Sequence, residues 1–323
     1  SVTDHPRAMA EDAAHSGRYT FCVALDGSDL SYKALRVALS LAQPKDTIVV
    51  LQVNDGSPGG HLAGKGAGVS PRAHTTVEAN ARVEALKYHI RPEQVREVTV
   101  DVTEGESVAR RIVTFADRHA RHLVIGASGR GAEGRAPSSH ARPLGSVAEH
   151  CLLKVRNPVI LVRGTHGKFE YREPDDVVGK NPRPALRFAC AVDNSRVARR
   201  AFDRAVSFAR AGDAVEVLHV HDGRGSGAPR DRFVELQPIY EAECTKVAAT
   251  RPGVACAFEG ILSKGGESVP RAIAEACEAR GVDLLVLGSA ELADMSKGFV
   301  LGSVAASCAR NTDANICVVK NFA

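Results

Sequence analysis

Short apolar runs without polar alternation recur along the chain, and each precedes or follows a segment with helical periodicity. Residues 19–25 form the first such run, Asp26-Gly27-Ser28 ends it, and apolar residues then recur at helical spacing over 34–41. A continuous apolar run is typical of a strand buried on both faces, whereas the second spacing gives a helix one apolar face. The pattern therefore predicts an α/β protein in which strands and helices alternate around a parallel sheet.

The same alternation continues through the first half of the chain. Further strands are expected at 47–53, 97–102, 122–126 and 158–162, with helices near 75–89, over 107–119 and at about 146–154. Ser28 or Asp29 is expected to cap the first helix, because both side chains accept hydrogen bonds from the free N–H groups of a first turn.

The second half of the chain repeats the first. Residues 21–53 align without a gap with 188–220, so that Asp26 falls on Asp193 and Val53 on Val220. Three later blocks recur in the same order: 105–108 as 266–269, 123–126 as 285–288, and 145–148 as 302–305. An internal repeat of this kind predicts two copies of one structural unit.

The repeat sets the expected domain organisation. We expect two tandem doubly wound domains, each with a five-stranded parallel sheet and its own core, at 18–162 and 186–323. Residues 163–185 are polar and rich in Gly and Pro, which is typical of a linker, and residues 1–17 are expected to be a disordered tail.

Charge and cysteine content narrow the class of protein. The net charge is only +4, and the pairs Arg110-Arg111 and Arg199-Arg200 are interpreted as solvated helix faces, so no nucleic-acid partner is expected. The eight cysteines show no CxxC pair and no metal-ligand spacing, which favours buried, reduced thiols, a cytoplasmic location and no metal site. No run approaches the ~20 apolar residues of a membrane span, so no membrane partner is expected.

Two carboxylates stand where α/β sheets bind ligands. Asp26 and Asp193 follow the first strand of each repeat, and ligands of open α/β sheets bind at the carboxyl ends of the strands. A carboxylate there accepts hydrogen bonds from ribose hydroxyls. The same residue also forms an Asx-turn or caps a helix, and both interpretations stand at this point.

Glycines follow the fourth strand and open the next helix. Gly126 and Gly129 come directly after the strand, and Gly145-Ser146 begins the helix. Glycine lets a backbone N–H approach phosphate oxygens, and a helix N-terminus adds free N–H groups and partial positive charge. The combination predicts an anion site, although glycines also serve plain turns.

Motifs for other chemistries are missing or incomplete. Residues 129–134 match GxGxxG, but the sequence continues as a loop where the dinucleotide fingerprint requires a helix. No Walker A motif, GxSxG or Ser-His-Asp order occurs, so no dedicated catalytic site is expected. His140 and Arg142 lie in the same loop, either as phosphate contacts or as solvated residues.

Together these residues resemble the universal stress protein family. Each repeat has an apolar strand ending in Asp and a second strand ending in Val, and the first has Gly-x2-Gly before a Gly-Ser. The resemblance implies an adenine-nucleotide α-hydrolase-like fold and a stress-response regulatory protein that binds ATP or AMP, with or without Mg²⁺. The residues implicated are Ala24, Asp26, Val53, Gly126, Gly129, Gly145, Ser146 and Val147, and in the second repeat Asp193, Val220, Gly288, Gly302 and Ser303.

Both repeats depart from the family pattern Gly-x2-Gly-x9-Gly-[Ser/Thr]. Fifteen residues separate Gly129 from Gly145, and Glu291 replaces the second glycine in the other repeat. A carboxylate facing phosphates repels them, so the first repeat is expected to bind nucleotide more tightly. The alternatives are a structural pseudo-dimer without a ligand and a slow ATP hydrolase, for which the sequence offers no base or metal ligand.

The resemblance also carries an expectation about assembly. Fifth strands lie at sheet edges, and exposed edges invite pairing. We expect residues 159–162 and 316–320 to pair antiparallel and form an intramolecular pseudo-two-fold dimer. Higher homo-oligomers of the whole chain remain compatible with the sequence.

Overall fold

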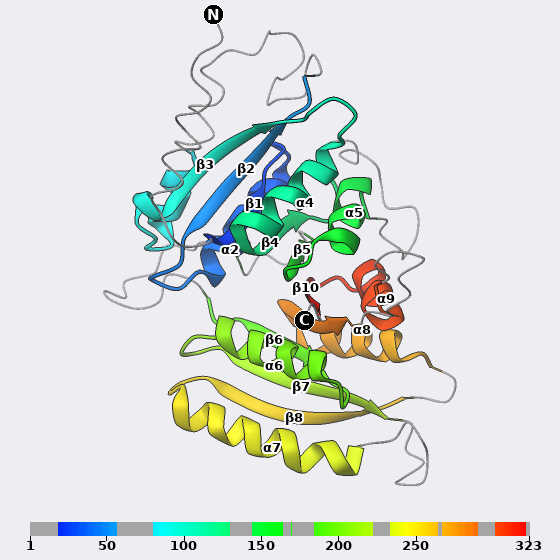
Figure 1. The fold of residues 1–323 in the computed structure, drawn as a ribbon. Helices are drawn as coiled ribbons and strands as arrows, with labels where there is room; N and C mark the ends of the chain where they lie inside the picture. The colour runs from blue at the N-terminus through cyan, green and yellow to red at the C-terminus, as the bar shows by residue number, and fades with distance from the viewer. Residues whose placement is uncertain are drawn as a thin grey trace, which may run out of the picture.

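A computed structural model describes residues 19–56, 80–129, 144–163, 169, 184–221, 233–263, 267–289 and 301–320 (Figure 1). The first repeat contains β1 (Tyr19–Ala24), α2 (Asp29–Leu41), β2 (Ile48–Asn54), the 3-10 turn η1 (Pro92–Gln94), β3 (Val95–Asp101), α4 (Val108–His119), β4 (Ala120–Gly126), α5 (Ser146–Lys154) and β5 (Val159–Val162). Residues 80–87 are also helical.

The second repeat has the same order of elements. It contains β6 (Arg187–Ala191), α6 (Arg196–Phe208), β7 (Ala214–His221), α7 (Phe233–Thr250), β8 (Ala255–Leu262), α8 (Val269–Arg280), β9 (Leu284–Ser289), α9 (Ser303–Asn311) and β10 (Asn315–Lys320). The predicted tail, 1–17, lies outside the described residues. No helix in the described part of the chain is long and apolar enough to cross a membrane.

All ten strands form one sheet in the order β3-β2-β1-β4-β5-β10-β9-β6-β7-β8. Strands within each repeat are parallel, and the order in one half mirrors the order in the other. The halves join where β10 pairs antiparallel with β5, with Cys317 opposite Ile160. The predicted fold class and the predicted pairing of the fifth strands are both confirmed (Figure 1).

The core is arranged by sheet face rather than by repeat. One apolar layer holds residues of α2, α6, α7 and the helical segment 80–87, and the other holds residues of α4, α5, α8 and α9. The expectation of a separate core for each domain is therefore wrong. The sheet is continuous across both repeats, so the helices on each side of it pack against one continuous apolar face.

The uninterrupted apolar runs follow from these two layers. Successive side chains of a strand point to opposite faces. In β2, Ile48 and Val50 belong to one layer, while Val49 and Leu51 belong to the other. Each of these side chains is at most 1% exposed. A strand that is covered on both faces has apolar residues at successive positions, without alternation between apolar and polar residues.

Some predicted boundaries are wrong by one or two residues. The third strand begins at Val95 rather than at 97, because Val95 pairs with Ile48 at the start of β2. The fourth begins at Ala120, which pairs with Tyr19. Within the predicted linker, Phe169 is 3% exposed, and its carbonyl accepts a hydrogen bond from the Tyr88 hydroxyl at 2.6 Å. This part of the linker packs on the first repeat.

Candidate functional site

The carboxyl ends of three adjacent strands bring the predicted site residues together. In the sheet, β1 lies between β2 and β4. Asp26 follows β1, Val53 is the penultimate residue of β2, and Gly126 ends β4. Because parallel strands end at the same edge, residues that are about a hundred positions apart in the sequence meet there.

Asp26 forms the turn that leads into α2. Its Oδ1 accepts hydrogen bonds from the backbone N–H of Ser28 at 2.9 Å and from the Ser28 hydroxyl at 2.6 Å. The Ser28 side chain in turn accepts from the N–H of Ser31 and caps α2. The Asx-turn interpretation is thus correct for one carboxylate oxygen, while the side chain as a whole stays exposed.

The second carboxylate oxygen of Asp26 faces the glycine loop after β4. A Cβ on Gly129 would lie 2.7 Å from Asp26 Oδ2, closer than real Cβ contacts come. Glycine lets the backbone at this position approach the carboxylate without displacing the Asp26 side chain. The structure therefore places Asp26 and Gly129 side by side at the sheet edge.

Gly145 closes the loop against the start of α5. Its N–H donates to the carbonyl of Ala127 at 2.8 Å. A Cβ on Gly145 would lie 3.3 Å from Ser128 Cα and 3.7 Å from the backbone N of Gly129. The two ends of the fifteen-residue spacer thus stay in contact, and its extra length does not separate the glycine loop from the helix.

The N-terminus of α5 lies at the same edge of the sheet. Gly145 is the N-cap, and no side chain in the described part of the protein caps the helix. Ser146 and Val147 follow as its first two residues, and the Ser146 side chain is exposed. Glu149 in the first turn forms an ion pair with Arg310 of the second repeat at 3.0 Å, which offsets its negative charge.

A small apolar surface borders the same edge. Ala24 is 9% exposed at the end of β1, and it belongs to the layer formed with α4 and α5. Val53 and Val147 are partly buried against that layer. Gly126 has a packing role, since a Cβ there would lie 3.0 Å from Leu30 Cγ.

The second repeat has a similar edge with different details. Asp193 Oδ1 accepts from the N–H of Ser195 at 2.9 Å, and Val220 is partly buried. A Cβ on Gly288 would lie 2.8 Å from the carbonyl carbon of Val197, so this glycine permits the backbone of α6 to pack closely on β9.

The start of α9 also differs from the start of α5. Gly302 is the N-cap, and its N–H donates to the Ser289 hydroxyl at 3.0 Å rather than to a backbone carbonyl. Ser303 is the exposed first residue of the helix. Glu291, His140 and Arg142 lie outside the described residues. Among the described residues, no group of three or more His, Cys, Asp or Glu side chains could hold a metal ion.

The fold and the sheet edge together define an α/β protein with a duplicated parallel-sheet unit and glycines at the ends of its strands. A model of the universal stress protein family matches residues 19–163 and 186–320. The chain belongs to the universal stress protein family and carries its domain twice.

Solved structures with the same arrangement span nearly the whole chain. A universal stress protein from Archaeoglobus fulgidus is 17% identical, with 94% of this chain and 96% of that chain covered and a TM-score of 0.54. A putative universal stress protein from Pseudomonas aeruginosa is 11% identical, with 94% of both chains covered and the same TM-score of 0.54.

A shorter similarity is to a universal stress protein from Archaeoglobus fulgidus that was solved in complex with dAMP. It is 20% identical and covers 42% of this chain and 98% of that chain, with a TM-score of 0.32. A comparison with curated proteins gives no match.

Proposed function

We propose that the chain is a nucleotide-binding regulatory protein of the stress response, and that the first repeat holds ATP or AMP at the edge formed by β1, β2 and β4. The observation that supports this most is the convergence of Asp26, Gly129 and Gly145. These residues come from three separate segments, and the contacts among them leave no room for a Cβ at Gly129.

Each part of the edge suits one part of an adenine nucleotide. The backbone of the glycine loop and the uncapped start of α5 provide N–H groups and partial positive charge for phosphate oxygens. The exposed carboxylate of Asp26 suits ribose hydroxyls. Ala24, Val53 and Val147 form an apolar surface against which an adenine ring could pack.

The second repeat is proposed as the weaker site. Gly288 is needed beneath the backbone of α6. The sequence places Glu291 where the first repeat has Gly129. Repulsion between one carboxylate and one phosphate charge is ~1 kcal/mol in water and a few times more near a protein surface. That penalty corresponds to about tenfold or more in affinity.

Nucleotide retained by the purified full chain tests the proposal. The protein is denatured with acid, and nucleotides in the supernatant are quantified by mass spectrometry, with a parallel sample first dialysed against ATP or AMP. We expect adenine nucleotide in near-stoichiometric amounts in at least one of these samples. If neither the isolated chain nor the chain dialysed against either nucleotide retains any, the proposal is wrong.

A further inference from the structure

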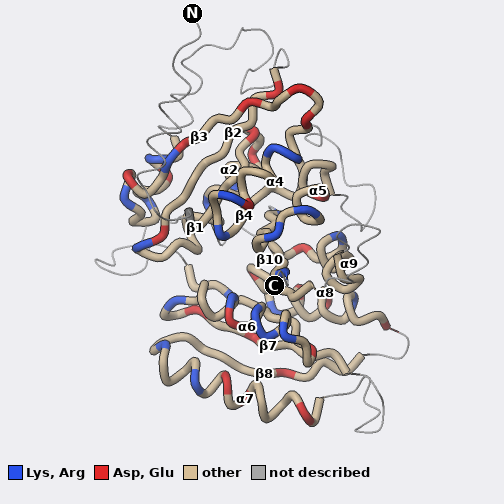
Figure 2. Tube along the Cα trace, viewed as in Figure 1, with Lys and Arg blue, Asp and Glu red and all other residues tan. Residues whose placement is uncertain are grey.

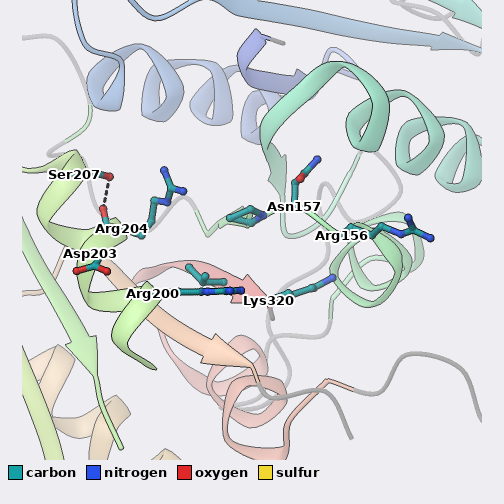
Figure 3. Close-up of a pocket in the computed structure, with 9 residues that line it drawn as sticks. Arg156, Asn157, Arg200, Asp203, Arg204, Ser207 and Lys320 are labelled. Carbon is teal, nitrogen blue, oxygen red and sulfur yellow. Dashed lines mark hydrogen bonds between the residues drawn. The ribbon is translucent and has the colours of Figure 1, made fainter. Parts of the chain in front are cut away.

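A second hollow lies where the two repeats meet, away from the proposed nucleotide site. It is a pocket of about 490 Å³ between α6, the end of β10 and the segment joining α5 to β5. Figure 3 shows Arg200 and Arg204 on α6, Lys320 on β10, and Asn157 and Arg156 on the opposite side, with the Arg156 guanidinium group directed away from the hollow. None of its lining residues belongs to the nucleotide site proposed above.

The lining of this pocket is strongly basic. Arg156, Arg200, Arg204 and Lys320 contribute four positive charges, against the one carboxylate of Asp203. That carboxylate is already engaged by Arg199, which does not line the pocket, at 3.4 Å. Figure 2 shows several basic positions along α6, which lies near β10 at this junction. The pocket therefore carries a net positive charge.

Two of these arginines make no ion pair within the described part of the chain. The backbone N–H of Arg156 donates to Asp117, but its guanidinium group has no carboxylate partner there. The guanidinium carbon of Arg204 lies 6.0 Å from the centre of the Phe208 ring. The charge of Arg204 also adds to the effect of burial in lowering the pKa of the nearby His122.

The floor of the pocket is held in place by hydrogen bonds. Lys320 is only 8% exposed, and its ammonium group donates to the carbonyl of Val155. Asn157 donates from Nδ2 to the carbonyls of Ala116 and Ala120, at 3.2 and 3.0 Å. A site whose charged and polar groups are already fixed loses less entropy when it binds a ligand.

The basic character is not imposed by the fold, because the repeat offers an internal comparison. By the alignment of the two repeats, Arg204 corresponds to Val37 and Arg156 to Asp313. Arg200 and Lys320 correspond to other cations, Lys33 and Arg163. The pseudo-two-fold related position therefore has the same backbone but lacks the two arginines that have no ion pair.

We propose that this pocket binds a small phosphorylated anion, with Arg204 and, once its side chain turns inward, Arg156 as its principal ligands. Guanidinium groups match phosphate oxygens with paired N–H donors, and they are always charged. The volume is within the roughly 300–1,000 Å³ of small-molecule sites, and a pocket of this size encloses a phosphorylated small molecule rather than an extended chain. Because residues of both repeats contribute, the ligand also bridges the two halves.

Inorganic pyrophosphate is the probe for this proposal, titrated calorimetrically into the full chain at low salt. We expect binding that weakens as salt is raised, and a loss of about tenfold or more in affinity for Arg204→Val and for Arg156→Ala. The matched control is Lys33→Ala at the pseudo-equivalent position on α2, which should change the affinity less than twofold. Circular dichroism melts confirm that each variant folds.

A second pair of measurements distinguishes binding at the basic pocket from binding at the proposed nucleotide site. The Arg156→Ala/Arg204→Val double variant should lose pyrophosphate binding and retain its ATP affinity, whereas Asp26→Asn should retain pyrophosphate binding. The proposal is overturned if pyrophosphate does not bind, if its affinity falls with Asp26→Asn but not with the arginine variants, or if a polyglutamate peptide binds through Arg204 while pyrophosphate does not.

Discussion

At the scale of single residues, His122 is a titratable group that the fold holds neutral. The side chain is 2% exposed, its Nδ1 lies 2.9 Å from the carbonyl of Thr20, and its ring stacks on Phe21 at 5.0 Å. The other ring nitrogen has no hydrogen-bond partner among the described residues. Burial, together with Arg204, lowers the pKa of His122 from 6.5 to about 3. The second repeat has Leu284 at this position.

This buried histidine predicts acid sensitivity. Between pH 6.5 and pH 3 the unfolded chain binds a proton on His122 that the folded chain does not, so the free energy of unfolding falls as the pH falls through this window. At pH 5 the loss is about 2 kcal/mol. His122→Asn keeps a donor for the Thr20 carbonyl and does not titrate. Urea unfolding at pH 7 and pH 5 should show a smaller loss for this variant, and equal losses would contradict the assignment.

The cysteines are a second residue-scale feature. Cys244 on α7 and Cys256 on β8 have sulfur atoms 2.7 Å apart, and a hydrogen bond from Cys256 lowers the pKa of Cys244. The other six are buried, and burial raises the pKa of Cys151, for example, to about 12. The first repeat has no such pair. Cys256 lies opposite Val215 in the sheet, and the residue opposite the equivalent Ile48 in the first repeat is Val95.

Brief treatment with diamide should therefore join Cys244 to Cys256 before any other pair. The two thiols lose two electrons and two protons, and diamide, a diazene, takes up both and becomes the corresponding hydrazine. Peptide mapping without reductant should find this disulfide, and thiol titration should show two thiols lost. Cys256→Ser is the control, since it should abolish the cross-link. A different disulfide in the map of the native chain would contradict the geometry.

At the scale of elements, much of the fold follows from local patterns, while exact contacts do not. Apolar runs predict the strands, and serines such as Ser28 and Ser195 cap α2 and α6 as their position suggests. Strand ends depend on the neighbouring strand, which is why β3 begins at Val95, opposite Ile48. The sequence pattern alone contains no information on that register.

Glycines show the same limit of prediction from sequence patterns. Gly126 and Gly288 occupy equivalent positions, yet the first faces the Leu30 side chain and the second faces the backbone of α6. The motif indicates that glycine is present for a reason, but it does not separate ligand approach from helix packing. Only the tertiary contacts make that distinction.

These two glycines should therefore differ in their tolerance of a methyl group. In Gly288→Ala the new Cβ would meet backbone atoms of Val197 and Ala198 at 2.8–2.9 Å, so α6 must shift. We expect the free energy of unfolding to fall by about 2 kcal/mol. In Gly126→Ala the new Cβ would meet the Leu30 side chain at 3.0 Å, which can rotate, and the Ser128 carbonyl oxygen at 3.1 Å, a milder backbone contact than in Gly288→Ala, so the loss should be smaller. Urea unfolding of both variants checks the order, and the reverse order would contradict it.

At the scale of the whole molecule, a duplicated sequence has become a single sheet with unequal halves. The junction of β5 and β10 is reinforced by Arg310 with Glu149 at 3.0 Å, and by the Arg163 N–H with Asn315 Oδ1 at 2.9 Å. The resemblance to the family predicted this pairing, because the fifth strands lie at sheet edges. The basic pocket was not predicted, because its arginines lie in different repeats and become neighbours only across the junction.

The sequence did contain one signal for that pocket. Arg204 and Arg156 stand where the other repeat has Val37 and Asp313, so a comparison of the two repeats position by position marks them as unusual. The interpretation of Arg199-Arg200 as a plain solvated face was incomplete. Arg199 bonds to Glu243 at 2.6 Å, and Arg200 lines the pocket.

The central claim, a nucleotide site in the first repeat that is stronger than its counterpart, is tested most directly by calorimetric titration of ATP into the full chain and two matched variants. Asp26→Asn and Asp193→Asn each keep an Oδ1 acceptor for the turn that precedes α2 or α6. The account predicts one tight site in the native chain, about tenfold or greater weakening in Asp26→Asn, and little change in Asp193→Asn. Loss of the tight site in Asp193→Asn, with ATP binding intact in Asp26→Asn, would contradict it.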